Sequence, residues 1–231
     1  MVTRDEATDT SQTGKVFVKV TILYSMVDAL SITQLQDQTT ADWHGPRGDE
    51  PMIVREGNST SLKELIRAQH RANFDLWHEE DKARDPKATD AGIAAVKRSI
   101  DKLNQWRNDL VEQIDSLLLA ELTPVFEAHI GSPLHSETPG MMIDRLSILA
   151  LKIFHTREES ERASATEEHR DKNKQRLALL HEQRDDLATA LAALEEDIVA
   201  GRKRFKLYRQ MKMYNDPELN PMIYTANHSK P

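Results

Sequence analysis

Residues 177–208 read LALLHEQRDDLATALAALEEDIVAGRKRFKLY, and this stretch decides the fold class. Apolar side chains recur three and four positions apart along it, the spacing that gathers them on one face of an α-helix. The spacing is interrupted at Arg184 and Gly201. It predicts a helix that is the longest of the chain, ends near Tyr214 and closes its apolar seam against another long helix.

Three further helices are expected, over residues 61–84, 90–122 and 140–162. Ser61 and Glu64 have the spacing of a capping box. Pro124 is expected to end the second helix, because the residue before a proline avoids the helical conformation. Thr138 and Pro139 suit the cap and first residue of the third. The 90–122 helix is the expected partner of the 177–208 seam by its length, so the chain is predicted to be an all-α antiparallel bundle of about four long helices.

Composition agrees with a helical protein. Aromatic residues make up only 5% of the 231 residues, too few for a β-sandwich or β-barrel of this size. The absence of cysteine excludes a disulfide framework, a thiolate metal site and a cysteine nucleophile. The net charge of −7 argues against nucleic acid as the main partner.

The N-terminal region is read as an irregular cover on the bundle. Its most apolar stretch, residues 16–30, is interrupted by Lys19 and Asp28, whereas a membrane span needs about 20 apolar residues. No transmembrane segment and a cytoplasmic location are therefore expected. The expected organisation is a partly disordered extension over 1–30, one helical domain over 31–224 and a flexible tail over 225–231.

Polar residues interrupt the apolar faces of the expected helices midway along their length. They are Gln69, Asn73, Glu80 and Arg84 on the first, and Asn104, Arg107, Asn108 and Asp115 on the second. The third helix adds Asp144 and Arg145. Burying such groups is costly unless they pair or meet a ligand. The pattern predicts a polar pocket inside an otherwise apolar bundle.

Each set of candidate residues carries two interpretations. In the functional one, arginines clamp an anion, asparagines bind hydroxyls, and carboxylates orient the ligand or act as acid and base. The candidates are Arg84, Arg107 and Arg145; Asn73, Asn104 and Asn108; and Glu80, Asp81 and Asp144, with His78 a further catalytic candidate. In the structural one, Asp81 pairs with Arg84, and the asparagines with Arg107 form a network that fixes helix register.

Metal ligation is weakly indicated. Glu112 and Asp115, three residues apart, are candidates to hold Mg²⁺ with waters. No HxxxH or HExxH spacing predicts a zinc site. His44, His70 and His155 are therefore interpreted as surface or packing residues.

Four long motifs carry a resemblance to a known family. They are WHEEDKARD from Trp77, KRSIDKLNQWRNDLVEQID from Lys97, ETPGMMIDRLSILALKIFH from Glu137 and MKMYNDPELNP from Met211. In this order they resemble an uncharacterised bacterial family catalogued as a domain of unknown function. The resemblance implies an all-helical domain without an established activity, and it hints at a place near cell-envelope polysaccharide assembly.

Three functions remain open at this point, and the sequence leaves open whether the protein is an enzyme. The first is binding of a small anionic or sugar-like ligand, such as a phosphorylated sugar or sugar nucleotide, in the polar pocket. The second is a non-catalytic scaffold, dimeric through the 177–208 seam. The third is a Mg²⁺-dependent nucleotide pyrophosphohydrolase that uses Glu112, Asp115 and a carboxylate of the 61–84 helix.

Overall fold

The computed structural model describes residues 28–45, 48, 61–210 and 218–221. These residues contain five helices and no strand: α2 (Ala29–His44), α3 (Leu62–Lys82), α4 (Asp90–Ala128), α5 (Pro139–Glu161) and α6 (Glu167–Val199). The predicted all-α class is confirmed. Among these helices, none combines the length and the apolar content needed to cross a bilayer. The predicted extension and tail lie outside the described residues, except for residues 28–30.

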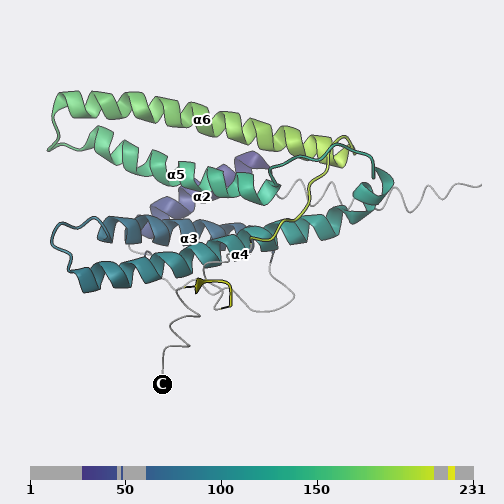
Figure 1. Ribbon diagram of the computed structural model, residues 1–231. Coiled ribbons are helices and arrows are strands. Elements are labelled where there is room, and N and C mark those ends of the chain that lie inside the picture. Colours follow the sequence, from purple (N-terminus) through teal and green to yellow (C-terminus); the bar gives the residue numbers. More distant parts are fainter. Residues whose placement is uncertain (1–27, 46–47, 49–60, 211–217, 222–231) are drawn as a thin grey trace, which may run out of the picture.

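The helices form two antiparallel hairpins, α3 with α4 and α5 with α6, and α2 packs between them (Figure 1). The expectation that the 177–208 seam closes on the 90–122 helix is wrong, because α6 packs mainly along α5 and makes little contact with α4. Connection length explains the difference. Only residues 162–166 join α5 to α6, and such short links make consecutive helices neighbours.

The expected irregular cover is a helix, α2. Its N-cap is Asp28, whose carboxylate accepts from the amides of Leu30 and Ser31. Much of its buried face is polar: Thr33, Gln36, Thr39 and Thr40. Gln36 donates from Nε2 to the Ile143 carbonyl of α5, 3.2 Å away. A helix that buries threonine and glutamine lacks the apolar periodicity from which helices are predicted.

Two of the expected helix boundaries are confirmed. Ser61 and Glu64 form the capping box of α3, and α5 begins at Pro139 after Thr138. The expected end of the second helix is wrong, because α4 continues through Pro124 to Ala128. Proline removes one amide donor, and the carbonyl that loses this donor belongs to the exposed Ala120, where water can replace it. At 39 residues, α4 and not α6 is the longest helix described.

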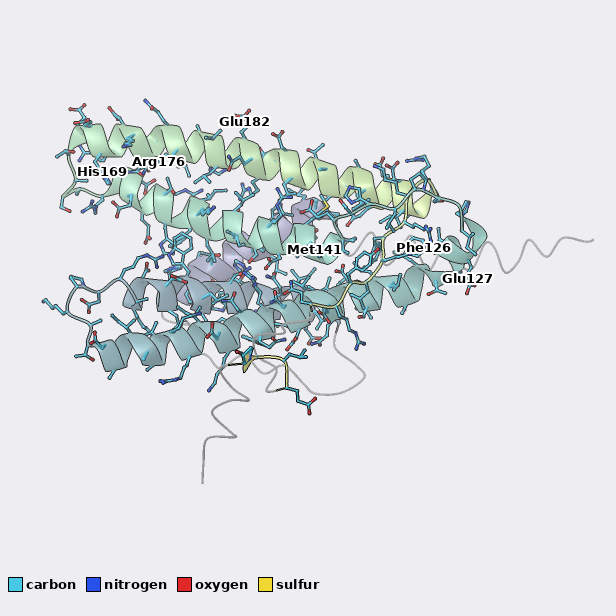
Figure 2. All side chains as sticks on the ribbon, viewed as in Figure 1. Phe126, Glu127, Met141, His169, Arg176 and Glu182 are labelled. Atoms are coloured by element: carbon cyan, nitrogen blue, oxygen red, sulfur yellow. The ribbon has the colours of Figure 1, made fainter. Side chains whose placement is uncertain are left out.

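The end of α6 also differs from expectation, at Val199 rather than near Tyr214. Gly201 has a φ of 69°, the left-handed conformation that ends many helices. The chain then turns back towards α4, and Phe205 is buried against Phe126 with ring centroids 5.6 Å apart (Figure 2). Tyr208, expected on the seam, is 57% exposed.

The apolar seam of α6 is buried within its own chain. Its buried members are Leu187, Leu191, Leu194 and Ile198. Arg184, the break in the seam, pairs with Asp37 of α2 at 2.7 Å. Glu182 lies on the opposite, exposed face of α6 (Figure 2). A homodimer through the 177–208 seam stays a prediction, and the bundle already buries the seam from Leu187 to Ile198.

Glu195 should make stability depend on pH. Burial and the nearby Asp28 carboxylate raise the pKa of Glu195 from 4.5 to about 8. Between these pH values the folded protein holds a proton that the unfolded chain releases. The contribution of Glu195 to the free energy of unfolding therefore falls as pH rises from 4.5 to about 8. We expect Glu195→Gln to raise the free energy of unfolding by about 2–4 kcal/mol at pH 8 and by much less at pH 5. Urea denaturation at both pH values measures this, with the exposed Glu196→Gln as control; an equal gain at both would contradict it.

Candidate functional site

A buried polar layer crosses the middle of the bundle. Asp144 of α5 accepts hydrogen bonds from Gln69 and Asn73 of α3, the latter at 2.9 Å. Arg107 of α4 approaches the same carboxylate, with 3.9 Å between its Nε and Oδ1. Gln69 and Asn73 are almost completely buried. Of the four polar residues expected on the inner face of α3, Gln69 and Asn73 therefore do point into the bundle.

His70 continues this layer towards α2. Asn73 donates to Ser147 Oγ at 2.9 Å, and Ser147 Oγ lies 2.7 Å from His70 Nδ1. His70 Nε2 lies 2.8 Å from Thr40 Oγ1, which donates to the Gln36 carbonyl. This chain of bonds requires the neutral Nε2–H tautomer of His70. Burial lowers the pKa of His70 to about 3, which agrees with a neutral, packed histidine.

A cavity of about 390 Å³ adjoins the polar layer between α3, α4 and α5. Its polar lining consists of Asn73, Glu80, Asp81, Arg84, Asn104 and Arg107. Its apolar lining consists of Leu76, Trp77, Ile148 and Leu151. Six of the candidate residues thus line one cavity, together with the indole of Trp77.

Two buried polar atoms, one in the cavity lining and one in the adjoining polar layer, have no hydrogen-bond partner among the described residues. They are Nε of Arg107 and Oε1 of Gln69. The Arg107 side chain is 25% exposed, so its guanidinium is partly accessible while Nε is enclosed. An unpaired buried donor is costly to the fold, and native proteins keep few of them.

Glu80 and Arg84 lie on the solvent side of the cavity rather than deep inside it. Their side chains are 47% and 69% exposed, and they pair with each other at 2.6 Å. The ion pair expected between Asp81 and Arg84 is therefore replaced by one between Glu80 and Arg84, four residues apart on the same side of the helix.

Arg145 and Asn108 do not line this cavity. Arg145 pairs with Glu137 at 2.7 Å and faces a groove of about 750 Å³ between α5 and α6. Its neighbour Asp144 points inward, and successive residues of a helix diverge by about 100°. Asn108 is buried elsewhere on α4. The three candidate arginines are therefore not gathered around one anion position.

Glu112 and Asp115 have separate partners. Asp115 is buried under the start of α5, where it accepts from the Thr138 hydroxyl and from the Gly140 amide at 2.8 Å. Burial raises the pKa of Asp115 to about 6, while these two donors oppose the shift. Glu112 accepts a hydrogen bond from the backbone amide of Gln210 at 3.0 Å. The pair that was a magnesium candidate thus joins α4 to α5 and to the C-terminal segment.

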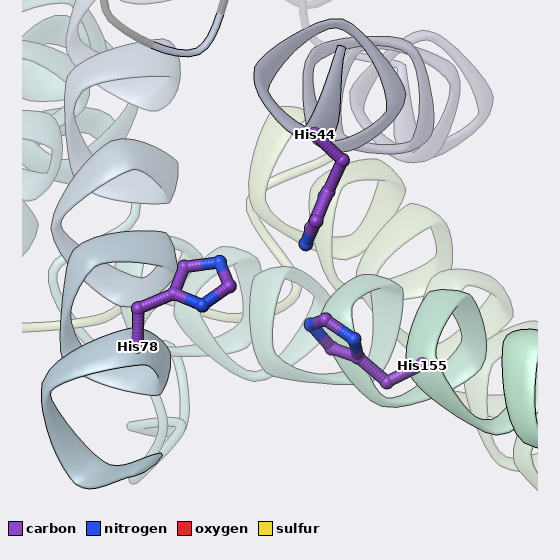
Figure 3. A group of neighbouring side chains, drawn as sticks. All are labelled: His44, His78 and His155. Carbon is purple, nitrogen blue, oxygen red and sulfur yellow. The ribbon is translucent and has the colours of Figure 1, made fainter. Parts of the chain in front are cut away.

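Three histidines come together that were not predicted to be neighbours: His44 of α2, His78 of α3 and His155 of α5 (Figure 3). Their ligating nitrogens all lie within 4.8 Å of one another. Burial lowers the pKa of His78 and of His155, which favours neutral imidazoles. Each histidine follows an aromatic residue, in the pairs Trp43-His44, Trp77-His78 and Phe154-His155, and this shared pattern is the signal that could have linked them.

Residues 63–207, more than half of the chain, match the family model described as protein of unknown function (DUF4254). The chain belongs to the DUF4254 family. The predicted membership of an uncharacterised family without an established activity is thereby confirmed. No curated protein and no solved structure matches the chain.

The DUF4254 match places the cavity inside the family domain. The matched residues extend from α3 to α6 and therefore include every residue that lines the cavity. It includes His78 and His155, while His44 belongs to α2, outside the matched residues.

Proposed function

We propose that this DUF4254 protein binds a small hydroxyl-rich ligand with one anionic group, such as a phosphorylated sugar, in the cavity between α3, α4 and α5. The observation that carries the proposal is the buried, unpaired Nε of Arg107 in the cavity lining. A folding role alone would favour a paired or apolar residue at this position. An anionic ligand oxygen would bind the accessible part of the same guanidinium, since the Arg107 side chain is 25% exposed.

The charges of the lining limit the ligand's own charge. Arg84 is balanced by Glu80, with which it pairs, and Arg107 is balanced by the Asp144 carboxylate at 3.9 Å, while Asp81 adds a negative charge to the lining. A cavity with this balance suits one phosphate or carboxylate group and repels a polyanion. This argues for a monophosphate rather than a sugar nucleotide with its diphosphate.

The uncharged part of the lining suits a sugar ring. Asn104 offers both a donor and an acceptor to the cavity. Trp77, Leu76 and Leu151 supply apolar surface for the C–H face of a ring. A ligand from cell-envelope polysaccharide assembly would have this chemistry.

Binding of glucose 1-phosphate tests the proposal, measured by calorimetry alongside glucose and inorganic phosphate. We expect glucose 1-phosphate to bind more tightly than either component. Arg107→Ala should weaken it about 10- to 100-fold, because a hydrogen bond to a charged group contributes about 1.5–3 kcal/mol.

Arg145→Ala is the matched control, since Arg145 lies outside the cavity and should leave the affinity unchanged. Equal losses in both variants would contradict the proposal. Absence of binding by all three probes at millimolar concentration would contradict it as well.

A further inference from the structure

The spacing of the nitrogens in the three clustered histidines is close to the spacing found around a bound metal ion. The ring centroids of His44 and His155 are 4.8 Å apart, and those of His44 and His78 are 5.2 Å apart. Zinc–nitrogen bonds of about 2.0–2.1 Å hold tetrahedral ligand nitrogens roughly 3.4 Å apart. The observed limit of 4.8 Å between ligating nitrogens is therefore within reach of imidazole rotations.

Hydrogen bonds fix two of the imidazoles in the form that a metal requires. His44 Nδ1 lies 2.8 Å from the Thr40 carbonyl, which can only accept, so Nδ1 carries the proton. His155 Nδ1 lies 3.0 Å from the Glu158 carboxylate in the same way. Each Nε2 then presents a lone pair, and both Nε2 atoms are buried with no partner among the described residues. A backbone carbonyl or carboxylate behind the imidazole is typical of metal-ligating histidines.

Aromatic rings hold the imidazoles in place. Trp77 stacks on His155 with ring centroids 4.8 Å apart, and Phe154 stacks on His44 at 4.2 Å. Phe74 packs edge-on against His78 at 4.5 Å. These ring contacts set the orientation of the imidazoles before a ligand arrives.

Carboxylates around the cluster favour a cation. Asp81 and Asp75 act electrostatically on His78, and Glu158 and Asp81 act on His155. Asp75 is paired with Arg71 at 2.8 Å, so Asp81 and Glu158 are the carboxylates that would attract a divalent ion.

We propose that His44, His78 and His155 bind one divalent transition-metal ion through their imidazole nitrogens. Three nitrogen ligands favour zinc and its transition-metal neighbours over Mg²⁺ or Ca²⁺, which require oxygen. Three protein ligands with a fourth position left open is also the ligand count of catalytic zinc sites. The inference rests on the histidine cluster alone and does not depend on the proposed sugar ligand.

The site would lie beside the cavity. Asp81 lines the cavity and acts on both His78 and His155, and Trp77 lines the cavity while it stacks on His155. The open position of the metal is therefore available to water, to Asp81 or to an oxygen of a molecule in the cavity.

Zinc titration of the untagged full chain, after removal of metals with EDTA, tests the inference. We expect one zinc ion per chain by calorimetry, and Co²⁺ should give the visible absorption of a tetrahedral site. His78→Ala should lower zinc affinity about 100-fold or more, because removal even of an outer partner costs 10- to 100-fold. Glu158→Gln, which spares the three ligands, should lower it about 10-fold.

His181→Ala is the matched control, a partly buried histidine on α6 whose loss should leave zinc affinity unchanged. Arg107→Ala should also retain zinc, which separates this site from the sugar phosphate. Failure of the wild-type chain to bind one zinc ion at micromolar concentration would overturn the inference. An equal loss of zinc affinity in His181→Ala would overturn it as well. If His78→Ala fails to fold by circular dichroism, the cobalt spectrum and Glu158→Gln still decide.

Discussion

Asp115→Ala is expected to lower the free energy of unfolding by about 3 kcal/mol. The buried carboxylate accepts from the Thr138 hydroxyl and the Gly140 amide at the start of α5. Its removal leaves both donors unsatisfied, at about 1–3 kcal/mol for each buried group. Urea denaturation should show the loss directly, and the melting temperature should fall by roughly 6–12 °C for a chain of this size.

Gly140→Ala tests the same contact from the other side. A Cβ at this position would lie 2.8 Å from Oδ1 of Asp115, whose carboxyl is held by its two donors. Helix propensity alone would make this substitution stabilising by about 1 kcal/mol, so a destabilised variant identifies the close contact. Gly131→Ala is the control, because nothing lies within 4 Å of its added Cβ.

Magnesium distinguishes this role from the metal role considered for Glu112 and Asp115. If Asp115 only accepts hydrogen bonds from the start of α5, millimolar Mg²⁺ should leave the melting temperature of the wild type unchanged. A rise in the wild type that is absent in Asp115→Ala would favour metal binding instead.

The sequence predicts those parts of the fold that local chemistry determines. The capping box at Ser61 and the Thr138-Pro139 start of α5 act within one turn, so they could be recognised without knowledge of the packing. The pairing of the helices could not be predicted from the length of their apolar faces, because the short connection at 162–166 decides that α6 lies on α5. The turn at Gly201 was not predicted, because a helix-compatible pattern continues beyond this glycine through Phe205.

The candidate site also has parts that the sequence predicts and parts that it does not. A helical wheel places Asn73 and Arg107 inward, because the period of a helix determines which face a residue occupies. The same wheel places Glu80 and Arg84 inward, but it does not show how far a long side chain extends, and both extend towards solvent where α3 ends. The histidine cluster depends on three helices meeting at one point, with His44 and His155 more than 100 residues apart. No spacing rule within one helix could reveal it.

Asp144→Ala is expected to cost roughly 2–4 kcal/mol of unfolding free energy, whereas Arg107→Ala should cost less than about 1 kcal/mol. Asp144 accepts from two buried amides, Gln69 and Asn73, and its loss leaves both donors unpaired. Arg107 reaches the carboxylate only at 3.9 Å and makes no hydrogen bond through Nε, so its removal breaks little.

A double-mutant cycle measured by urea denaturation separates the two contacts. The coupling energy between Asp144 and Asn73 should be about 1 kcal/mol or more, as for neighbours that share a buried hydrogen bond. The coupling between Asp144 and Arg107 should be within about 0.5 kcal/mol of zero. A strong coupling to Arg107 would mean that the arginine belongs to the structural network, and its guanidinium would then not be free for a ligand. Weak coupling together with loss of glucose 1-phosphate binding in Arg107→Ala would assign the amides to folding and the arginine to recognition.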